Sequence, residues 1–191
     1  MTRTLYLPLC LVIALLALAG CRGAQTGPLV DIQGQAAKSL TVSSAAFKEG
    51  ATIPTRYTCS GEDISPALAW SGAPKDTKAF ALVFDDPDGA NPAFTHWLLA
   101  NIPATEQSLA ENAPRDGTLS NGATQGQNGF DKLGYGGPCP PPGDAHHYHF
   151  AIYALDATPS LDPGFSKQQL ASAMQGHTLA WGELVGLFAR S

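Results

Sequence analysis

The sequence predicts a mainly β fold, a sandwich of two antiparallel sheets with a few short helices. Two observations predict it. Charged residues make up 14% of the chain, and 20 glycines and 15 prolines break it into short segments, which favours strands and turns over long helices. Between the breaks lie short runs of β-branched and aromatic residues, with one helical pattern late in the chain. Many short strands joined by Pro- and Gly-rich loops are typical of packed antiparallel sheets.

The expected strands are the short apolar runs bounded by turn residues. In chain order they are residues 40–44, 79–84, 96–102 and 146–155, with a closing strand near 184–189. The run 79–84 is apolar throughout and stops at Asp85-Asp86-Pro87-Asp88-Gly89, whose residue types favour a turn. Both alternating faces of 146–155 carry apolar side chains, so this strand is expected at the centre of a sheet.

A long loop and one helix complete the secondary structure that we expect. Residues 121–144 are dense in Gly, Asn and Pro and are expected to form a loop. A helix is expected over residues 166–175, because Ser166 is a suitable N-cap, an apolar stripe follows it, and Gly176 stands at the position after the helix end.

Residues 1–20 have the layout of an export signal. Arg3 precedes an uncharged apolar run, residues 5–19, which is shorter than the roughly 20 residues of a membrane-spanning helix. The run ends in Leu18-Ala19-Gly20-Cys21, which resembles the lipobox of bacterial lipoproteins. The resemblance implies cleavage before Cys21 and acylation of Cys21 with fatty acids such as palmitate. The alternative is an ordinary secreted protein in which this cysteine is coincidental.

A lipid on Cys21 would hold the protein on a bacterial membrane, facing the periplasm or the exterior, because two or three acyl chains anchor stably. Arg22, and not Asp, follows the cysteine, which favours the outer membrane in a Gram-negative cell. Residues 21–38 are rich in Gly, Gln and Ala and are expected to form a flexible tether. Residues 39–191 then suit one domain.

Charge and cysteine content bound the function further. Sixteen acidic residues exceed eleven basic ones, and no Lys/Arg-rich run is present, which argues against nucleic acid as a partner. Of the four cysteines, Cys10 lies in the signal and Cys21 is the lipid site. Cys59 and Cys139 remain, in a compartment that permits disulfides. The sequence leaves open whether they form a bridge or stay two separate buried thiols.

Ordered blocks of sequence resemble the phosphatidylethanolamine-binding protein family, in its bacterial Raf-kinase-inhibitor-like branch. The resemblance covers the chain from about residue 40 onward. Its blocks include Asp85-Asp86-Pro87-Asp88, Thr95-His96-Trp97 and Gly134-Tyr135-Gly136-Gly137-Pro138-Cys139-Pro140-Pro141, together with residues 53–70, 101–103, 146–156 and 176–180. The resemblance implies a two-sheet β-sandwich with a small surface pocket for phosphate, acetate or a phospholipid head group. We expect no cofactor and no bound metal, since no Asp, Glu or Cys is placed by sequence to complete a metal site with the histidines.

The resemblance also places the pocket residues by motif position. They are the carboxylate of Asp86, the histidines His96 and His146, the aromatic Tyr148, and a wall formed by Pro140 and Pro141. Two imidazoles supply N–H groups to an anion, and a neighbouring carboxylate fixes their tautomer. Two positions depart from the family pattern. His147 stands where Arg is usual beside the Asp-Pro-Asp loop, and Gly89 stands where Ala is usual.

We therefore expect a lipid-anchored envelope protein that binds a small anion or a phospholipid head group and is not an enzyme. The sequence contains no G-x-S-x-G nucleophile motif. An alternative is an inhibitor or modulator of an envelope protein, such as a serine protease. A metal-dependent or acid–base enzyme is a further alternative, since His147 and His149 lie two apart on one expected strand face.

Overall fold

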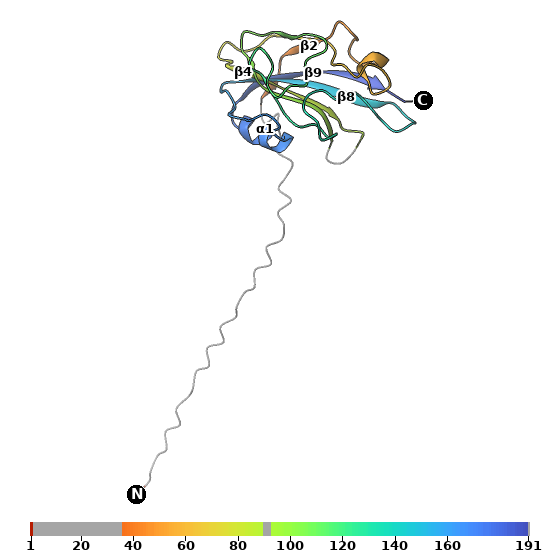
Figure 1. The fold of residues 1–191 in the computed structure, drawn as a ribbon. Coiled ribbons are helices and arrows are strands. Elements are labelled where there is room, and N and C mark those ends of the chain that lie inside the picture. The colour runs from red at the N-terminus through yellow and green to blue at the C-terminus, as the bar shows by residue number, and fades with distance from the viewer. Residues whose placement is uncertain (2–35, 90–92, 191) are drawn as a thin grey trace.

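The computed structural model describes Met1 and residues 36–89 and 93–190. The expected signal peptide, Cys21 and residues 21–35 of the tether lie outside the described residues. The described chain forms two sheets packed face to face, with one helix on the outside (Figure 1). Within these residues, none of the helices is both long and apolar enough to cross a membrane.

The larger sheet has six strands and the smaller one has three. The order in the larger sheet is β1 (Ala37–Lys38), β9 (Thr178–Phe188), β8 (His146–Leu155), β4 (Ala79–Asp86), β5 (Phe94–Pro103) and β7 (Thr124–Gln125). The order in the smaller sheet is β2 (Thr41–Ser43), β3 (Leu68–Ser71) and β6 (Ser108–Leu109). Neighbouring strands run antiparallel, except that β1 runs parallel to β9. The expected mainly β sandwich is therefore confirmed, with one parallel pair at its edge.

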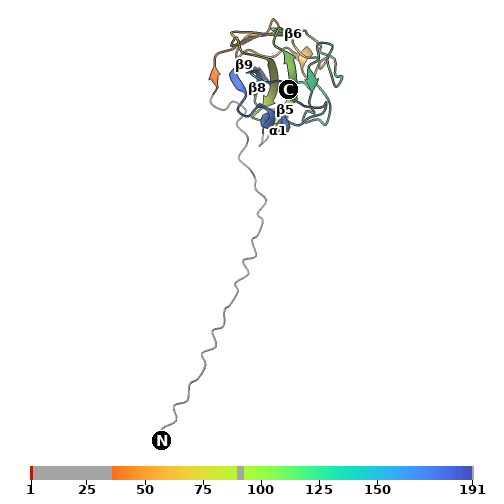
Figure 2. The ribbon, with the colours of Figure 1, turned by 90° about the vertical axis from the view of Figure 1, so that its left-hand side faces the viewer.

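The main core fills the space between the sheets. Phe84 of β4 stacks on Phe150 of β8 with ring centroids 3.8 Å apart, and Trp70 of the smaller sheet meets Phe80 at 5.4 Å. A second apolar cluster covers the outer face of the larger sheet and includes Leu170. Figure 2 shows the three layers in order: the smaller sheet, the larger sheet and the helix.

The helix α1 (Lys167–Met174) begins where the sequence predicts. The Ser166 hydroxyl accepts a hydrogen bond from the Gln169 backbone N–H at 3.2 Å, and the Gln169 side chain accepts one from the Ser166 N–H at 2.8 Å. This reciprocal pair satisfies two N–H groups that the first turn leaves free. Gly176 has φ +78°, a conformation that favours glycine after a helix end. A short 3₁₀ helix, η1 (Thr55–Tyr57), lies in the loop before β3.

Several strand limits differ from the expectation. β4 continues through Asp85 and Asp86, which were expected in the turn, and β5 spans Phe94–Pro103 and not 96–102. β9 begins at Thr178 and not near residue 184, because its alternating burial continues through Trp181 and Gly182. The expected tether ends before residue 38, because Ala37 and Lys38 pair with Ala180 and Trp181 of β9. The expected central strand is found at 146–155, between β9 and β4. Its inner face carries Tyr148 and Phe150, as the alternation predicts.

Candidate functional site

The end of β4 and the start of β8 bring Asp86 and His146 together. Asp86 is 3% exposed, and its Oδ2 lies 2.8 Å from His146 Nδ1. Its Oδ1 accepts the Asp88 backbone N–H at 2.9 Å. Because a carboxylate only accepts, His146 donates through Nδ1, and its Nε2 is left for other partners. A Cβ at position 89 would lie 2.9 Å from Asp86 Oδ2, so Gly89 leaves room for this carboxylate.

A β-bulge turns His96 toward the same site. Phe84 pairs with Trp97 and Asp85 pairs with Thr95, so His96 is the extra residue between the two pairs. Trp97 points into the main core, and the bulge lets the neighbouring His96 ring also reach the inner rings Phe84 and Tyr148. Bulges commonly redirect a side chain in this way.

Four aromatic rings surround the His96 imidazole, which is 2% exposed. Their centroids lie 5.0 to 5.5 Å from it and belong to Phe84, Phe94, Phe130 and Tyr148. His96 Nδ1 lies 2.7 Å from the Gly136 carbonyl oxygen, so Nδ1 carries a proton and donates it to this bond. Burial lowers the pKa of His96 below its ordinary value, against the opposing effects of the Gly136 carbonyl and of Asp86. The neutral ring therefore keeps a lone pair on Nε2.

The ring of Tyr148 lies near those of both histidines. The Tyr148 ring is 5.3 Å from that of His96 and 6.3 Å from that of His146. The residue is 0% exposed. Its hydroxyl lies near the Asp86 carboxylate and the Cys139 backbone but makes no hydrogen bond of normal geometry with a described residue. Burial, followed by the charge of Asp86, raises the pKa of Tyr148 well above its ordinary value. A buried hydroxyl without a partner of good geometry is costly.

The segment that follows Gly134 borders the site and is held by a disulfide. Cys59 and Cys139 are bonded, which joins two parts of the chain 80 residues apart. The Cys59 N–H also donates to the Pro138 carbonyl at 3.1 Å. Pro140 is buried beside this bridge, whereas Pro141 is exposed. Of the two expected wall residues, Pro140 therefore lies on the inner side and Pro141 on the surface.

His147 occupies the place of the usual arginine beside the Asp-Pro-Asp loop. Its backbone N–H and its Nδ1 both lie 2.8 Å from Asp88 Oδ2. These bonds, the backbone one first, lower the pKa of Asp88. His149, on the same strand face, instead pairs with Glu183 at 2.9 Å. In the described part of the chain, no group of three or more His, Cys, Asp or Glu residues is placed to hold a metal ion.

Two cavities flank the aromatic rings around His96. One, of about 330 Å³, is lined by Phe94 and Lys167, and the other, of about 150 Å³, by Phe130 and Arg115. Phe94 and Phe130 stand edge to face at 4.8 Å between the two. The six expected pocket residues line neither of these cavities. Sequence reasoning missed Phe94 and Phe130, although Phe94 lies two residues before His96 on one strand.

The fold and this arrangement define a class of protein: a two-sheet β-sandwich with a buried Asp–His–Tyr cluster at one end of the larger sheet. The family model described as phosphatidylethanolamine-binding protein matches residues 43–189. The chain therefore belongs to the phosphatidylethanolamine-binding protein family, as the sequence blocks predicted.

Relatives and solved structures agree with this assignment. A UPF0098 protein of Methanothermobacter thermautotrophicus is 46% identical over 151 residues, which cover 79% of this chain and 99% of that protein. A Mycobacterium tuberculosis protein named "Putative lipoprotein LppC" is 35% identical over 186 residues, 90% of each chain. The crystal structure of YbcL from E. coli matches with TM-score 0.75 and 35% identity, over 80% of this chain and 99% of that one. CT736 from Chlamydia trachomatis matches with TM-score 0.72 and 36% identity, over 81% and 100%.

Proposed function

We propose that this protein binds a small anion at the cluster of Asp86, His96, His146 and Tyr148, and that it does so as a lipid-anchored protein of the cell envelope. The ligand is a phosphate-type group, free or in a phospholipid head group, and the role is binding and not catalysis. The observation that carries the proposal is the Tyr148 hydroxyl, which is buried beside Asp86 and makes no hydrogen bond of normal geometry with a described residue. An anionic oxygen is the acceptor that this hydroxyl lacks.

The two histidines determine how such an anion is held. Asp86 fixes His146 through Nδ1, and the Gly136 carbonyl fixes His96 through Nδ1. Each ring then offers Nε2, which donates only when the ring is protonated. Asp86 already brings a negative charge to the site. Binding of an anion is therefore favoured when the site takes up a proton together with the anion, or when the anion carries a P–OH group that donates to His96. Binding is therefore expected to strengthen as pH falls.

The envelope location has separate support. The lipobox-like quartet ending at Cys21 favours it, and the Mycobacterium tuberculosis relative carries a lipoprotein name. Ala37 pairs with Ala180 near the start of β9, whereas His146 pairs with Phe188 at its end. These positions are about 25 Å apart at roughly 3.3 Å per residue. The described chain therefore enters the larger sheet at the end away from the site.

Calorimetric titration tests the proposal on residues 36–191. This segment is suitable because the Methanothermobacter thermautotrophicus relative, 99% matched, consists almost entirely of this domain. Inorganic phosphate, phosphoethanolamine and short-chain phosphatidylethanolamine are the ligands, at about pH 6 and about pH 7.5. The wild type and a His149→Ala control should bind, and a His96→Ala/His146→Ala double variant should not. Equal binding by the double variant, or none by the wild type, would overturn the proposal. The three ligands separate a free anion from a head group.

A second candidate is modulation of an envelope protein such as a serine protease. Two large apolar residues of the described chain are exposed, Met1 and Phe130. Phe130 is 38% exposed, and its ring contacts that of His96. Exposed aromatic residues often anchor protein contacts. Inhibition of a purified envelope protease that is lost on Phe130→Ala, and kept in the His96→Ala/His146→Ala variant, would favour this candidate.

A further inference from the structure

The smaller cavity is lined in part by the segment that borders the histidine site. It has a volume of about 150 Å³ and is lined by Arg115, Lys132, Asn128, Phe130 and Cys59, among others. Gly136 and Gly137 form part of its wall. The Gly136 carbonyl accepts the His96 N–H, and the Gly137 N–H donates to Asp63 Oδ1 at 2.7 Å. The two regions therefore share one stretch of backbone.

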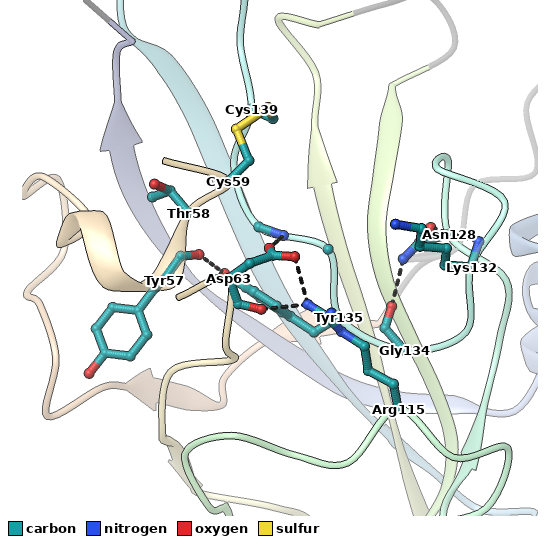
Figure 3. A network of polar contacts seen from close by, with 12 residues as sticks. Tyr57, Thr58, Cys59, Asp63, Arg115, Asn128, Lys132, Gly134, Tyr135 and Cys139 are labelled. Atoms are coloured by element: carbon teal, nitrogen blue, oxygen red, sulfur yellow. Dashed lines mark hydrogen bonds and ion pairs between the residues drawn. A yellow bond between two sulfur atoms is a disulfide. The ribbon is translucent and has the colours of Figure 1, made fainter. Parts of the chain in front are cut away.

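Arg115 is held in place and still has donors to offer. Its Nη2 donates to the Asp63 carboxylate at 2.7 Å and also to the Asp63 carbonyl (Figure 3). Both bonds use the same nitrogen, so Nε and Nη1 keep their N–H groups without a partner in the described chain. Because Asp63 is itself tied to Gly137, the guanidinium is positioned before any ligand arrives. A fixed guanidinium with free N–H groups is well suited to bind an oxyanion.

A tight turn places Lys132 and Phe130 at the same cavity. The Asn128 side chain is 4% exposed, and its Oδ1 accepts the backbone N–H groups of Phe130 and Lys132 at 2.9 and 3.2 Å. Asn128 Nδ2 donates to the Gly134 carbonyl at 2.9 Å. The Lys132 ammonium makes no ion pair with a described carboxylate, and the adjacent Asp131 does not line the cavity. The lining of the cavity thus includes two basic residues and one carboxylate, that of Asp63.

We propose that this cavity is a second anion-binding site, which takes a small carboxylate with an apolar substituent. Arg115 and Lys132 bind the carboxylate, and the substituent packs against the exposed ring of Phe130. The site differs from the histidine cluster because its charge is permanent and does not depend on proton uptake. The ligand would also contact the wall made by Gly136 and Gly137, so its binding is expected to shift the His96 environment.

The test is a titration of residues 36–191 with sodium benzoate, followed by the amide NMR signals of the domain. Saturable shifts are expected first at Phe130, Lys132, Gly136 and Gly137. Lys132→Met should weaken binding about tenfold, as expected for the loss of a charge-assisted bond. Arg115→Lys keeps the charge but loses the planar fork, and should weaken binding several-fold. Lys75→Met removes another exposed lysine away from the cavity and should change nothing.

Two outcomes would overturn the second site. One is unchanged benzoate affinity in both Lys132→Met and Arg115→Lys. The other is loss of benzoate binding in the His96→Ala/His146→Ala variant, which would place benzoate in the histidine cluster. Retained binding in that variant supports the second site, whether or not the histidine cluster binds phosphate. Failure of one proposal is therefore distinguishable from failure of the other.

Discussion

The histidine cluster and the Arg115 cavity share one backbone segment, that of Gly136 and Gly137, but rely on different electrostatics. The cluster is buried, with Asp86 at 3% and His96 at 2% exposure, and its two histidines donate through Nε2 only after taking up protons. The cavity is partly open, and its Arg115 and Lys132 are charged at any physiological pH. Burial makes one region sensitive to pH, and exposure makes the other sensitive to salt.

The largest expected effect comes from the bridge that the two regions share. A Cys59→Ser/Cys139→Ser variant frees a segment otherwise tied across a sequence separation of 80, and should lose about 2–4 kcal/mol of unfolding free energy. Urea denaturation measures this loss. Wild-type protein treated with a reductant should show the same midpoint as the variant. An unchanged midpoint in both would mean that the bonds of Tyr135 and Asp63 hold the segment without the bridge.

Removing the hydroxyl group from either of two buried tyrosines should give the next largest effect on the unfolding free energy, with opposite signs at the two positions. The Tyr148 hydroxyl makes no hydrogen bond of normal geometry in the described chain, so Tyr148→Phe should raise the unfolding free energy by about 1 kcal/mol while weakening phosphate binding. The Tyr135 hydroxyl donates to the Tyr57 carbonyl at 2.6 Å, so Tyr135→Phe should lower it by about 1 kcal/mol. Urea denaturation and calorimetry check both. A loss of stability in Tyr148→Phe would contradict the assignment of its hydroxyl to a ligand.

The fold and part of this site were predictable from local patterns. Alternation placed Tyr148 and Phe150 on one face of β8, and Ser166 marked the start of the helix. The register of β4 against β8 pairs Asp85 with His149. This register brings Asp86 close enough to His146 for a hydrogen bond. No local signal reports that register, so the grouping of these residues came from resemblance to the family.

Other features of the site depend on contacts that no local pattern contains. The bulge at His96 breaks the alternation of side chains along β5, which would otherwise place His96 on the face of the sheet opposite to that of Trp97. Arg115 and Asp63 are 52 residues apart and lie in irregular segments. The long loop expected over 121–144 hid both the Asn128 turn and the short strand β7. Loops are therefore where the sequence was least informative and where the second site was found.

The titration of His96 should give a smaller effect on stability. Burial lowers its folded pKa below the unfolded value of about 6.5, so the unfolded chain binds more protons between the two values. The contribution of His96 to stability is then fully present above about pH 6.5 and is lost as pH falls toward the folded pKa. Unfolding free energies of wild type and His96→Gln between about pH 5 and pH 8 check this. If the two curves run parallel, His96 is not the titrating group.

Added salt should give the smallest effect, a change in ligand affinity. It also distinguishes the Arg115 cavity from the histidine cluster most directly. Ions screen exposed charges over about 8 Å at physiological ionic strength, so benzoate affinity at the Arg115 cavity should fall about threefold between about 0.05 and 0.5 M sodium chloride. Lys132→Met should flatten that dependence, because one of the two screened cations is gone. Phosphate binding at the buried cluster, measured at about pH 6, should fall less, since Asp86, His96 and Tyr148 lie out of solvent. Equal salt dependence at the two regions would show that both anions bind through the same exposed cations, and the separation of the two regions by burial would then be wrong.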